Sequence, residues 1–464
     1  MHLQELGAIE SCTPCKSQFI STYFLVDKPN GDKRFILNLK KLNKFIKPPH
    51  FKLEDIRTAV KLISPGCFMA KLDLKDAYFL VPVHHQDRKF LRFLFRDLPD
   101  RKRLATKNMI ERFQTETRCT IREFASLIGT LISCCPAIAY GTLYSKNLES
   151  EKQLRLIIND GNFETRMTVP RSIQSDLEWW HSHVMSSSGP IRTKIFSATI
   201  FTDASMTGWG AAWEGNSTRG LWSADERTNH INFLELLAIS LALKCFAQNL
   251  SNCEILLRVD NTTAISYINR MGSTRVPKLN RLAREIWQWC ESKSLWLFAS
   301  YIPSKENTEA DRESRYTNID TEWELADYAF NHLVARLGKP EIDLFASRIN
   351  AKCKDYYSWR RDPCALSVDA FTISWSDRFF YAFPPFSLVL PTLRKIFNDQ
   401  ATGIVVVPQW TAQPWYPLFL TALIEEPIIF KPSMDLLRSP CRTIHHPLAN
   451  WITLVAGKLS GRRT

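Results

Sequence analysis

The sequence predicts a multidomain α/β protein. A chain of 464 residues is too long for one compact core and suggests about three domains. Short apolar runs bounded by turn residues alternate with stretches of helical periodicity along most of its length. Its composition, 45% hydrophobic and 23% charged residues without a low-complexity tract, is typical of folded globular domains.

The periodicity divides the chain into four segments. The first alternates apolar strands, at 19–26 and 34–37, with basic turns, and the second has the periodicity of packed helices. The third is predicted to contain a hairpin, a long helix, a strand, further helices, a strand and a last helix. The fourth is a separate α/β unit with strands at 341–345 and 403–407. These segments span residues 1–97, 98–190, 191–316 and 317–464.

The formal net charge of +13 favours a polyanionic partner, because basic residues gain affinity by displacing counterions from phosphates. The N-terminus has no apolar signal region, and no uncharged run is long enough to cross a membrane. The twelve cysteines are scattered, and only Cys12 and Cys15 have the spacing of metal ligands. We therefore expect an intracellular protein, in the cytoplasm or nucleus, with reduced thiols and no membrane partner.

Four acidic residues in the third segment each stand where a carboxylate can serve a metal. Asp203 follows an apolar strand, and Glu235 lies in the first turns of an apolar helix. Asp260 ends the strand 255–259, and Asp311 lies in the last helix. Phosphodiester hydrolysis uses two divalent cations about 4 Å apart, and Mg²⁺ or Mn²⁺ prefers carboxylate oxygens. We therefore expect these residues to bind two ions.

Each acid also has a structural alternative. Asp203 and Asp260 could cap a turn or a helix, and Asp311 could be a surface residue. Glu235 is flanked by apolar residues on both sides, so it lies on or beside a buried face and requires a partner. The order of all four favours a shared site.

The blocks TDAS…GWGAAW, NFLELLA, RVDNTTA and PSKENTEADRESR resemble the ribonuclease H domain of retroelements, particularly the DIRS group of tyrosine-recombinase retrotransposons. The resemblance covers residues 191–316. It implies a mixed five-stranded sheet with helices and hydrolysis of the RNA strand of an RNA–DNA hybrid, with Asp203, Glu235, Asp260 and Asp311 as the catalytic acids. Related elements commonly have a histidine where this chain has Tyr301.

The N-terminal blocks KPNGDKRFILNLKKLN, HFKLED and KLDLKDAYFLVPV resemble the fingers and first palm motif of a reverse transcriptase, an α+β fold. By this resemblance Asp73 is a metal ligand and Tyr78 is the gate that discriminates the sugar. Lys28, Arg34 and Asp76 would lie near the triphosphate. An ordinary turn with two acids is the alternative. The resemblance ends near Phe95, and no adjacent Asp-Asp pair follows anywhere in the chain.

The fourth segment resembles phage-type DNA adenine methyltransferases, which implies a Rossmann-like α/β unit that binds S-adenosylmethionine. The resemblance rests on Asp343, on Pro384 and Pro385, and on Phe386 as a face on which an extruded base would stack. Phe383 stands where the family has Asp or Asn, and it cannot accept a hydrogen bond from the target amine. We therefore expect the fold without methyl transfer, or a Pro-Pro loop that only packs aromatic side chains.

The leading interpretation is an RNA–DNA hybrid ribonuclease within a truncated retrotransposon polyprotein. The alternative is a catalytically inactive nucleic-acid-binding remnant that uses its basic surface and aromatic residues such as Trp209 and Trp222. A third possibility is an unfolded relic, because the incomplete palm leaves apolar strands unpaired.

The incomplete palm generates the first prediction. With Asp73 as the one palm ligand, two-metal nucleotide addition cannot be assembled, so the purified protein will not extend a DNA primer on an RNA template in Mg²⁺. A primer-extension assay measures this, with a complete reverse transcriptase as positive control. Template-dependent extension would contradict the prediction.

Overall fold

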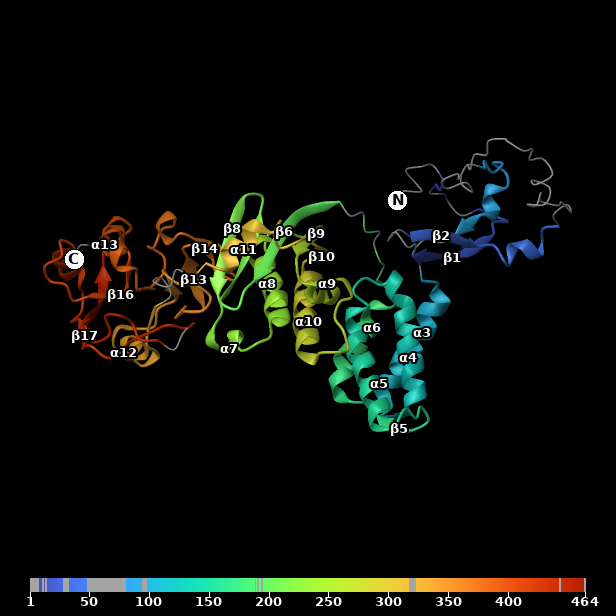
Figure 1. Ribbon diagram of the computed structural model, residues 1–464, viewed down its shortest axis with the longest axis horizontal. Helices are drawn as coiled ribbons and strands as arrows, with labels where there is room; N and C mark the ends of the chain where they lie inside the picture. Colours follow the sequence, from blue (N-terminus) through green and yellow to red (C-terminus); the bar gives the residue numbers. More distant parts are fainter. Residues whose placement is uncertain are drawn as a thin grey trace, which may run out of the picture. The chain divides into compact units, whose positions relative to one another are not determined.

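The computed structural model describes residues 8–10, 12, 15–27, 33–47, 81–93, 98–187, 189, 192, 195–316, 323–441 and 444–462. It confirms a multidomain α/β protein with mixed sheets (Figure 1). Its contacts divide the chain into two compact units. The first comprises Met1–Glu111, Ser133–Ala139 and His181–Thr193, and the second comprises Arg112–Ile132, Tyr140–Trp180 and Lys194–Thr464. Among the described residues, no helix has the length and apolar character needed to cross a membrane.

An antiparallel hairpin is the main element of the first unit. Its strands are β1 (Ile20–Asp27) and β2 (Lys33–Asn38), and β3 (Arg92–Phe93) pairs with β1 in parallel. These strands match the two that the sequence predicts. The first palm motif lies outside the described residues.

Helices dominate residues 98–190, as their periodicity predicts. In α4 the residues Ile121, Phe124, Leu127, Ile128 and Leu131 are all buried, and their spacing of three and four places them on one face. A short antiparallel pair of strands, β4 and β5, joins this region. The elements are α3 (Asp100–Thr115), β4 (Arg118–Thr120), α4 (Ile121–Cys134), α5 (Lys146–Ile158), β5 (Arg166–Thr168) and α6 (Gln174–His183).

The middle of the second unit is a five-stranded mixed sheet with the strand order β10-β9-β6-β7-β8. β6, β7 and β8 form an antiparallel meander, whereas β9 and β10 run parallel to β6. The strands are β6 (Phe196–Ala204), β7 (Gly208–Trp213), β8 (Asn216–Leu221), β9 (Glu254–Val259) and β10 (Trp296–Tyr301). The helices are α7 (Ala224–Arg227), α8 (Ile231–Phe246), α9 (Thr262–Asn269), α10 (Pro277–Ser292) and α11 (Thr308–Ser314).

Helix α11 lies directly against β7, and glycine makes this possible. A Cβ atom at Gly210 would overlap the carbonyl oxygen of Ala310 and the amide of Ser314, so only glycine lets the helix approach the strand. The neighbouring β7 residue Trp213 projects to the other face, where its ring contacts Phe246 of α8. The sheet is therefore covered by α8 on one face and by α11 on the other.

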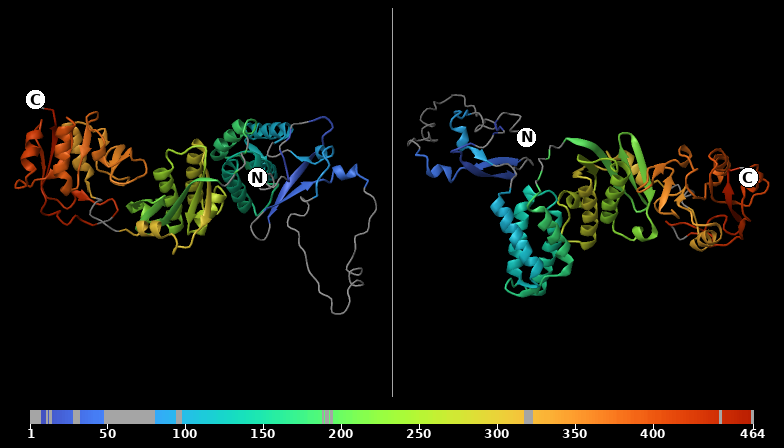
Figure 2. Two further views of the ribbon diagram at one scale, coloured as in Figure 1. Left: turned by 90° about the horizontal axis from the view of Figure 1, so that it is seen from above. Right: turned by 180° about the vertical axis from the view of Figure 1, so that it is seen from behind.

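The last part of the chain, orange to red in Figure 2, forms an α/β unit. Its sheet has seven strands in the order β14-β13-β12-β15-β16-β19-β17. The first five of these strands are parallel to one another, and β19 is antiparallel to both of its neighbours. The strands are β12 (Ile342–Asp343), β13 (Asp355–Ser358), β14 (Ser367–Val368), β15 (Phe380–Ala382), β16 (Thr402–Pro408), β17 (Ile428–Phe430) and β19 (Leu454–Ser460). A separate small pair joins β11 (Glu324–Leu325) and β18 (Leu437–Arg438).

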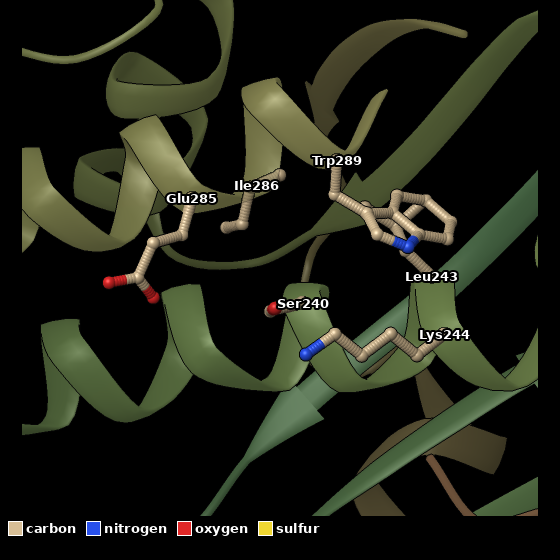
Figure 3. A pocket seen from close by; sticks show the side chains of 6 residues that line it. All are labelled: Ser240, Leu243, Lys244, Glu285, Ile286 and Trp289. Carbon is tan, nitrogen blue, oxygen red and sulfur yellow. The ribbon is translucent and has the colours of Figure 1, made fainter. Parts of the chain in front are cut away.

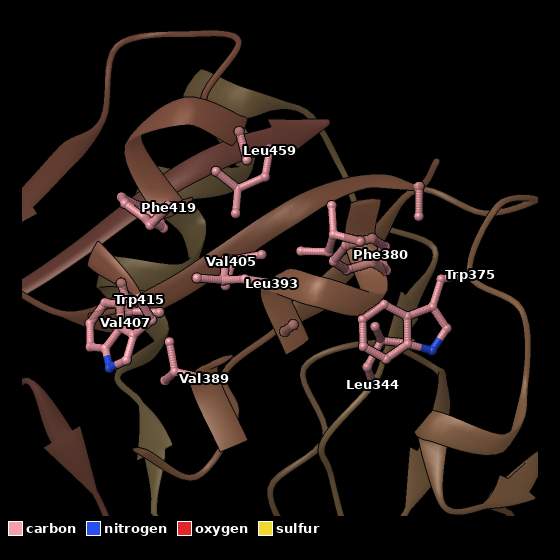
Figure 4. Close-up of a cluster of buried hydrophobic side chains, with 14 of the residues drawn as sticks. Leu344, Trp375, Phe380, Val389, Leu393, Val405, Val407, Trp415, Phe419 and Leu459 are labelled. Carbon is pink, nitrogen blue, oxygen red and sulfur yellow. The ribbon is translucent and has the colours of Figure 1, made fainter. Parts of the chain in front are cut away.

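Both faces of this sheet are apolar, as expected for mainly parallel strands between helices. Along β16, Val405 and Val407 pack with α13 (Val389–Asn398) and α14 (Tyr416–Ala422) in one core (Figure 4). The alternate residues Ile404 and Val406 pack with α12 (Asp327–Leu337) in a second core. The predicted strand 341–345 is shorter in the structure, where β12 contains two residues.

A buried ion pair joins α6 to α10 and generates the second prediction. Arg284 binds Asp176, whose side chain is fully buried. Arg284→Met leaves the carboxylate unpaired and is expected to lower the free energy of unfolding by about 3–5 kcal/mol, measured by urea denaturation. Arg122→Met is the control, because its pair with Glu164 is exposed and contributes at most about 1 kcal/mol. Equal losses in the two variants would contradict the role of burial.

Candidate metal centre

Three of the predicted acids lie at one edge of the five-stranded sheet. Asp203 is near the end of β6, and Asp260 directly follows β9. Because β6 and β9 are parallel neighbours, their carboxyl ends lie side by side. Glu235 reaches the same place from the start of α8, which packs against β6. The order of strands and helix therefore brings together residues that are distant in sequence.

The three carboxylates form a compact cluster. One oxygen atom from each of Asp203, Glu235 and Asp260 lies within 4.8 Å of the other two. Asp203 and Glu235 are buried, with 3% and 4% of their surface exposed, whereas Asp260 is partly exposed. Glu235 Oε2 is buried without a hydrogen-bond partner among the described residues. A buried oxygen of this kind requires a proton or a cation.

The environment favours the protonated form of two of these acids. Burial, reinforced by the charges of Asp203 and Asp260, raises the pKa of Glu235 to about 9. Burial raises the pKa of Asp203 to about 6, although a hydrogen bond from Ser314 acts in the opposite direction. Without a cation, Glu235 therefore carries a proton at neutral pH. A divalent cation would compete with that proton for the same oxygen.

Two serine hydroxyls orient the cluster. Ser314 Oγ of α11 donates to Asp203 Oδ2 at 2.5 Å, and Ser304 Oγ donates to Asp260 Oδ2 at 2.6 Å. Each bond restricts its carboxylate to one rotamer and leaves the other oxygen available. The sequence analysis missed both serines, because contacts across more than forty residues leave no local signal in the sequence.

Asp311, the fourth predicted ligand, lies outside this group of three. Its Oδ1 accepts a hydrogen bond from Arg315 Nε at 2.7 Å, one turn further along the chain. It is near enough for its charge to raise the pKa of Asp203. The guanidinium of Arg315, which is 67% exposed, therefore neutralises the carboxylate that was expected to hold a second ion.

Four of the five expected polymerase residues lie outside the described residues, namely Lys28, Asp73, Asp76 and Tyr78. Arg34 lies on β2, where its backbone pairs with Val26. Their roles stay predictions from the sequence.

Asp343 contacts the backbone of the loop that follows its strand. It lies at the carboxyl end of β12, and burial raises its pKa to about 6. Its Oδ1 accepts the amide of Phe345 at 3.2 Å, and its Oδ2 accepts the amide of Lys352 at 3.0 Å. Both oxygens therefore hold the loop after β12, and Asp343 is only 2% exposed.

The Pro-Pro turn follows β15, the strand that pairs with β12. Pro384 is buried and Pro385 is exposed. Phe386 is partly exposed, and its ring contacts Trp410 at 5.2 Å and Phe383 at 6.4 Å between centroids. Because these aromatic rings pack on one another, the structure matches the expectation of a turn that packs aromatic side chains.

A hollow of about 310 Å³ lies between α8 and α10 (Figure 3). Ser240 and Lys244 of α8 face Glu285 and Trp289 of α10 across it. It lies along the second half of α8, away from the end that carries Glu235. The metal-binding chemistry is therefore not located in this hollow.

Comparison with known proteins gives only distant matches. No protein-family model and no curated protein matches the chain. Ribonuclease H1 from Halobacterium salinarum NRC-1 is 18% identical, with 25% of this chain and 92% of that protein covered and a TM-score of 0.21. A foamy viral protease-reverse transcriptase bound to dsDNA is 10% identical, with coverages of 65% and 81% and a TM-score of 0.19. The same enzyme with an RNA/DNA hybrid is 10% identical, with coverages of 42% and 26% and a TM-score of 0.17.

The raised pKa of Glu235 generates the third prediction. An acid whose pKa is about 9 when folded, against an ordinary 4.5, stabilises the fold at low pH and loses that contribution as the pH rises between these values. In EDTA at pH 8, Glu235→Gln is therefore expected to unfold at a higher temperature than the wild type, by about 2–4 °C for each kcal/mol recovered. Differential scanning calorimetry measures the shift.

The difference should disappear at pH 4, where the wild-type side chain is protonated in both states. Glu285→Gln, at an exposed position on α10, is the control and should show no such pH dependence. A Glu235→Gln variant that is less stable than the wild type at pH 8 would contradict the buried, protonated carboxyl.

Proposed function

We propose that this chain is a divalent-cation-dependent ribonuclease that cleaves the RNA strand of RNA–DNA hybrids. The observation that carries the proposal is the convergence of Asp203, Glu235 and Asp260, with oxygen atoms within 4.8 Å of one another and one buried oxygen of Glu235 unpartnered. The choice of an RNA–DNA hybrid rests on the sequence resemblance of residues 191–316.

The donor set fits a hard cation. All three groups are carboxylates, the ligands that Mg²⁺ and Mn²⁺ prefer. Three negative charges in a mostly buried site repel one another. Burial and this repulsion together raise the pKa values of Asp203 and Glu235. A bound cation would offset both effects. Asp203, Glu235 and Asp260 would hold the first ion, and Asp311 would help to hold a second.

The chain's own residues position this site. When bound, two divalent cations supply an activated water and stabilise charge on the phosphate oxygens. Ser314 keeps Asp203 Oδ2 directed toward α11, and Ser304 fixes Asp260. Asp311 becomes available to a second ion when its side chain leaves Arg315. The ion pair between these two residues is largely exposed and therefore weak. The rigid part of the site is formed by the sheet, and the adjustable part by α11.

The alternative, an inactive nucleic-acid-binding remnant, requires different residues from those first expected. Trp209 and Trp222 are 1% and 0% exposed, so neither indole ring can stack on a base. Neither residue can therefore supply the predicted stacking contact with a base. Their position in the sheet core explains this difference, because local sequence does not reveal which faces of a strand are covered.

The other two resemblances support no additional activity. The reverse transcriptase portion stays a prediction of an incomplete, inactive palm. For residues 317–464 we propose a fold retained without methyl transfer, because Phe383 cannot accept a hydrogen bond and Asp343, which accepts two backbone amides, is only 2% exposed. S-adenosylmethionine is therefore not expected to bind at Asp343.

The fourth prediction tests the ribonuclease directly. Incubation of the full chain with an end-labelled RNA–DNA hybrid in Mg²⁺ or Mn²⁺ should give RNA cleavage, and Asp203→Asn should lower the rate at least about 100-fold because it removes a shared ligand. Asp225→Asn, at an exposed position on α7, is the matched control and should cleave normally.

Two results would overturn the proposal. One is equal cleavage by the wild type and Asp203→Asn, which would assign the activity to another site or a contaminant. The other is binding of the hybrid without cleavage by the wild type in either metal, which would support the inactive remnant.

A further inference from the structure

A second hollow, of about 50 Å³, lies at the opposite side of the five-stranded sheet from β10. It is bordered by the edge strand β8 and by the loops that follow β12 and β13, all in the second compact unit. A hydrogen bond from Thr218 Oγ1 to the carbonyl oxygen of Arg361 joins the two sides. The volume is enough for a phosphate-sized anion, since a water needs roughly 10–15 Å³.

Three arginines line this hollow, Arg219, Arg348 and Arg360. Arg348 is paired with both oxygens of Glu226, at 2.8 and 2.9 Å. Asp362 is also at the hollow, where its Oδ1 accepts the Arg348 amide at 3.0 Å. Arg348 is therefore paired with Glu226, and Arg219 and Arg360 are the remaining cationic residues of a lining that also includes the Asp362 carboxylate.

Arg219 and Arg360 share one carboxylate. Glu313 lies 2.7 Å from Arg219 and 3.8 Å from Arg360, and it also pairs with Arg312 at 3.3 Å. The distance to Arg360 exceeds a hydrogen bond. Burial and the charge of Arg219 lower the pKa of Arg360, which shows that its positive charge is poorly compensated. An anion in the hollow would supply the missing partner.

An unused hydrogen-bond donor also lines the hollow. Trp209 is 1% exposed, and its Nε1 has no hydrogen-bond partner among the described residues. Gly220 lies beside it, and a Cβ atom at that position would be 2.6 Å from Nε1. Glycine at this position therefore lets β8 lie close to the indole N–H, which is buried. Buried donors without a partner are rare, and an acceptor such as a phosphate oxygen would satisfy this one.

An exposed aromatic ring stands at the rim. Trp359 is 74% exposed, although it lines the same hollow, and the Arg360 guanidinium lies 5.8 Å from its ring centroid. Many proteins bind single-stranded nucleic acids with an aromatic ring that lies next to cationic groups. The ring stacks on a base, and the cationic groups contact the phosphate backbone. Single-stranded nucleic acid is the occupant that uses all of these features.

We propose that this hollow binds a phosphate group of a single-stranded nucleic acid while the adjacent base stacks on Trp359. Arg360 and Arg219 contact the phosphate, and the Trp209 Nε1–H donates to one of its oxygens. The site does not depend on hydrolysis at the carboxylate cluster, so it stands whether or not the chain cleaves hybrids.

Fluorescence anisotropy of the full chain with a labelled single-stranded oligothymidylate in EDTA tests the proposal. Trp359→Ala should weaken binding about 10-fold, because one stacked base is lost. Arg360→Gln should reduce the slope of log affinity against log salt by about one, the loss of one phosphate contact. Unchanged affinity in the first variant together with an unchanged slope in the second overturns the proposal.

Two matched controls lie elsewhere in the same part of the chain. Trp451→Ala removes an indole that is 83% exposed, and Arg378→Gln removes an arginine beside the opposite, amino-terminal end of β13. Neither should change the affinity or the slope. If either control lowers binding as much as its test variant does, the contribution is a general surface effect and the proposal is overturned.

Two further experiments distinguish free phosphate from nucleic acid as the ligand, and the hollow from the carboxylate cluster as the binding site. If inorganic phosphate raises the melting temperature of the wild type but not of Arg360→Gln, while oligonucleotide affinity is the same in both, the hollow binds free phosphate and the nucleic-acid proposal fails. Asp203→Asn should bind the oligonucleotide normally, whether or not the wild type cleaves hybrids. Failure of the ribonuclease proposal therefore leaves this result unaffected.

Discussion

The central constraint on this protein is the repulsion among Asp203, Glu235 and Asp260, whose oxygens are held within 4.8 Å of one another. The fold provides the free energy that holds them together. Parallel pairing fixes the ends of β6 and β9 side by side, and buried Leu234 and Leu236 anchor the start of α8 on either side of the acid. Protonation of Asp203 and Glu235 reduces this repulsion, as their raised pKa values show. A bound cation would reduce the same repulsion.

The sequence predicted the cluster where its signal is local. An apolar strand followed by an acid identified Asp203 and Asp260, and an acid within an apolar helix identified Glu235. It could not predict that Asp311 would pair with Arg315, because a carboxylate one turn before an arginine can turn either toward it or toward the sheet. The contacts of the side chain, which involve residues distant in sequence, decide between these two rotamers.

The difference between local sequence signals and contacts distant in sequence also explains which parts of the rest of the fold could be predicted. Ile404, Val405, Val406 and Val407 form a continuous apolar run, which predicts a strand that is covered on both faces. In the structure these residues point alternately into the two cores. Tryptophan exposure has no comparable signal. Trp209 is buried on β7, which lies between β6 and β8 inside the sheet, whereas Trp359 follows an interior strand but lies in a loop. Burial of an aromatic residue therefore depends on the position of its strand in the sheet.

Helix α11 connects the carboxylate cluster to the arginine-lined hollow. Ser314 donates a hydrogen bond to Asp203 of the cluster, while Glu313 beside it binds Arg219 on the edge strand and lies near Arg360. A helix of seven residues has too few internal hydrogen bonds to hold its own position, so these flanking contacts set where Asp311 stands. Since Glu313 is 6% exposed and shared among several arginines, a phosphate that relieved those arginines would weaken one of the contacts that position α11.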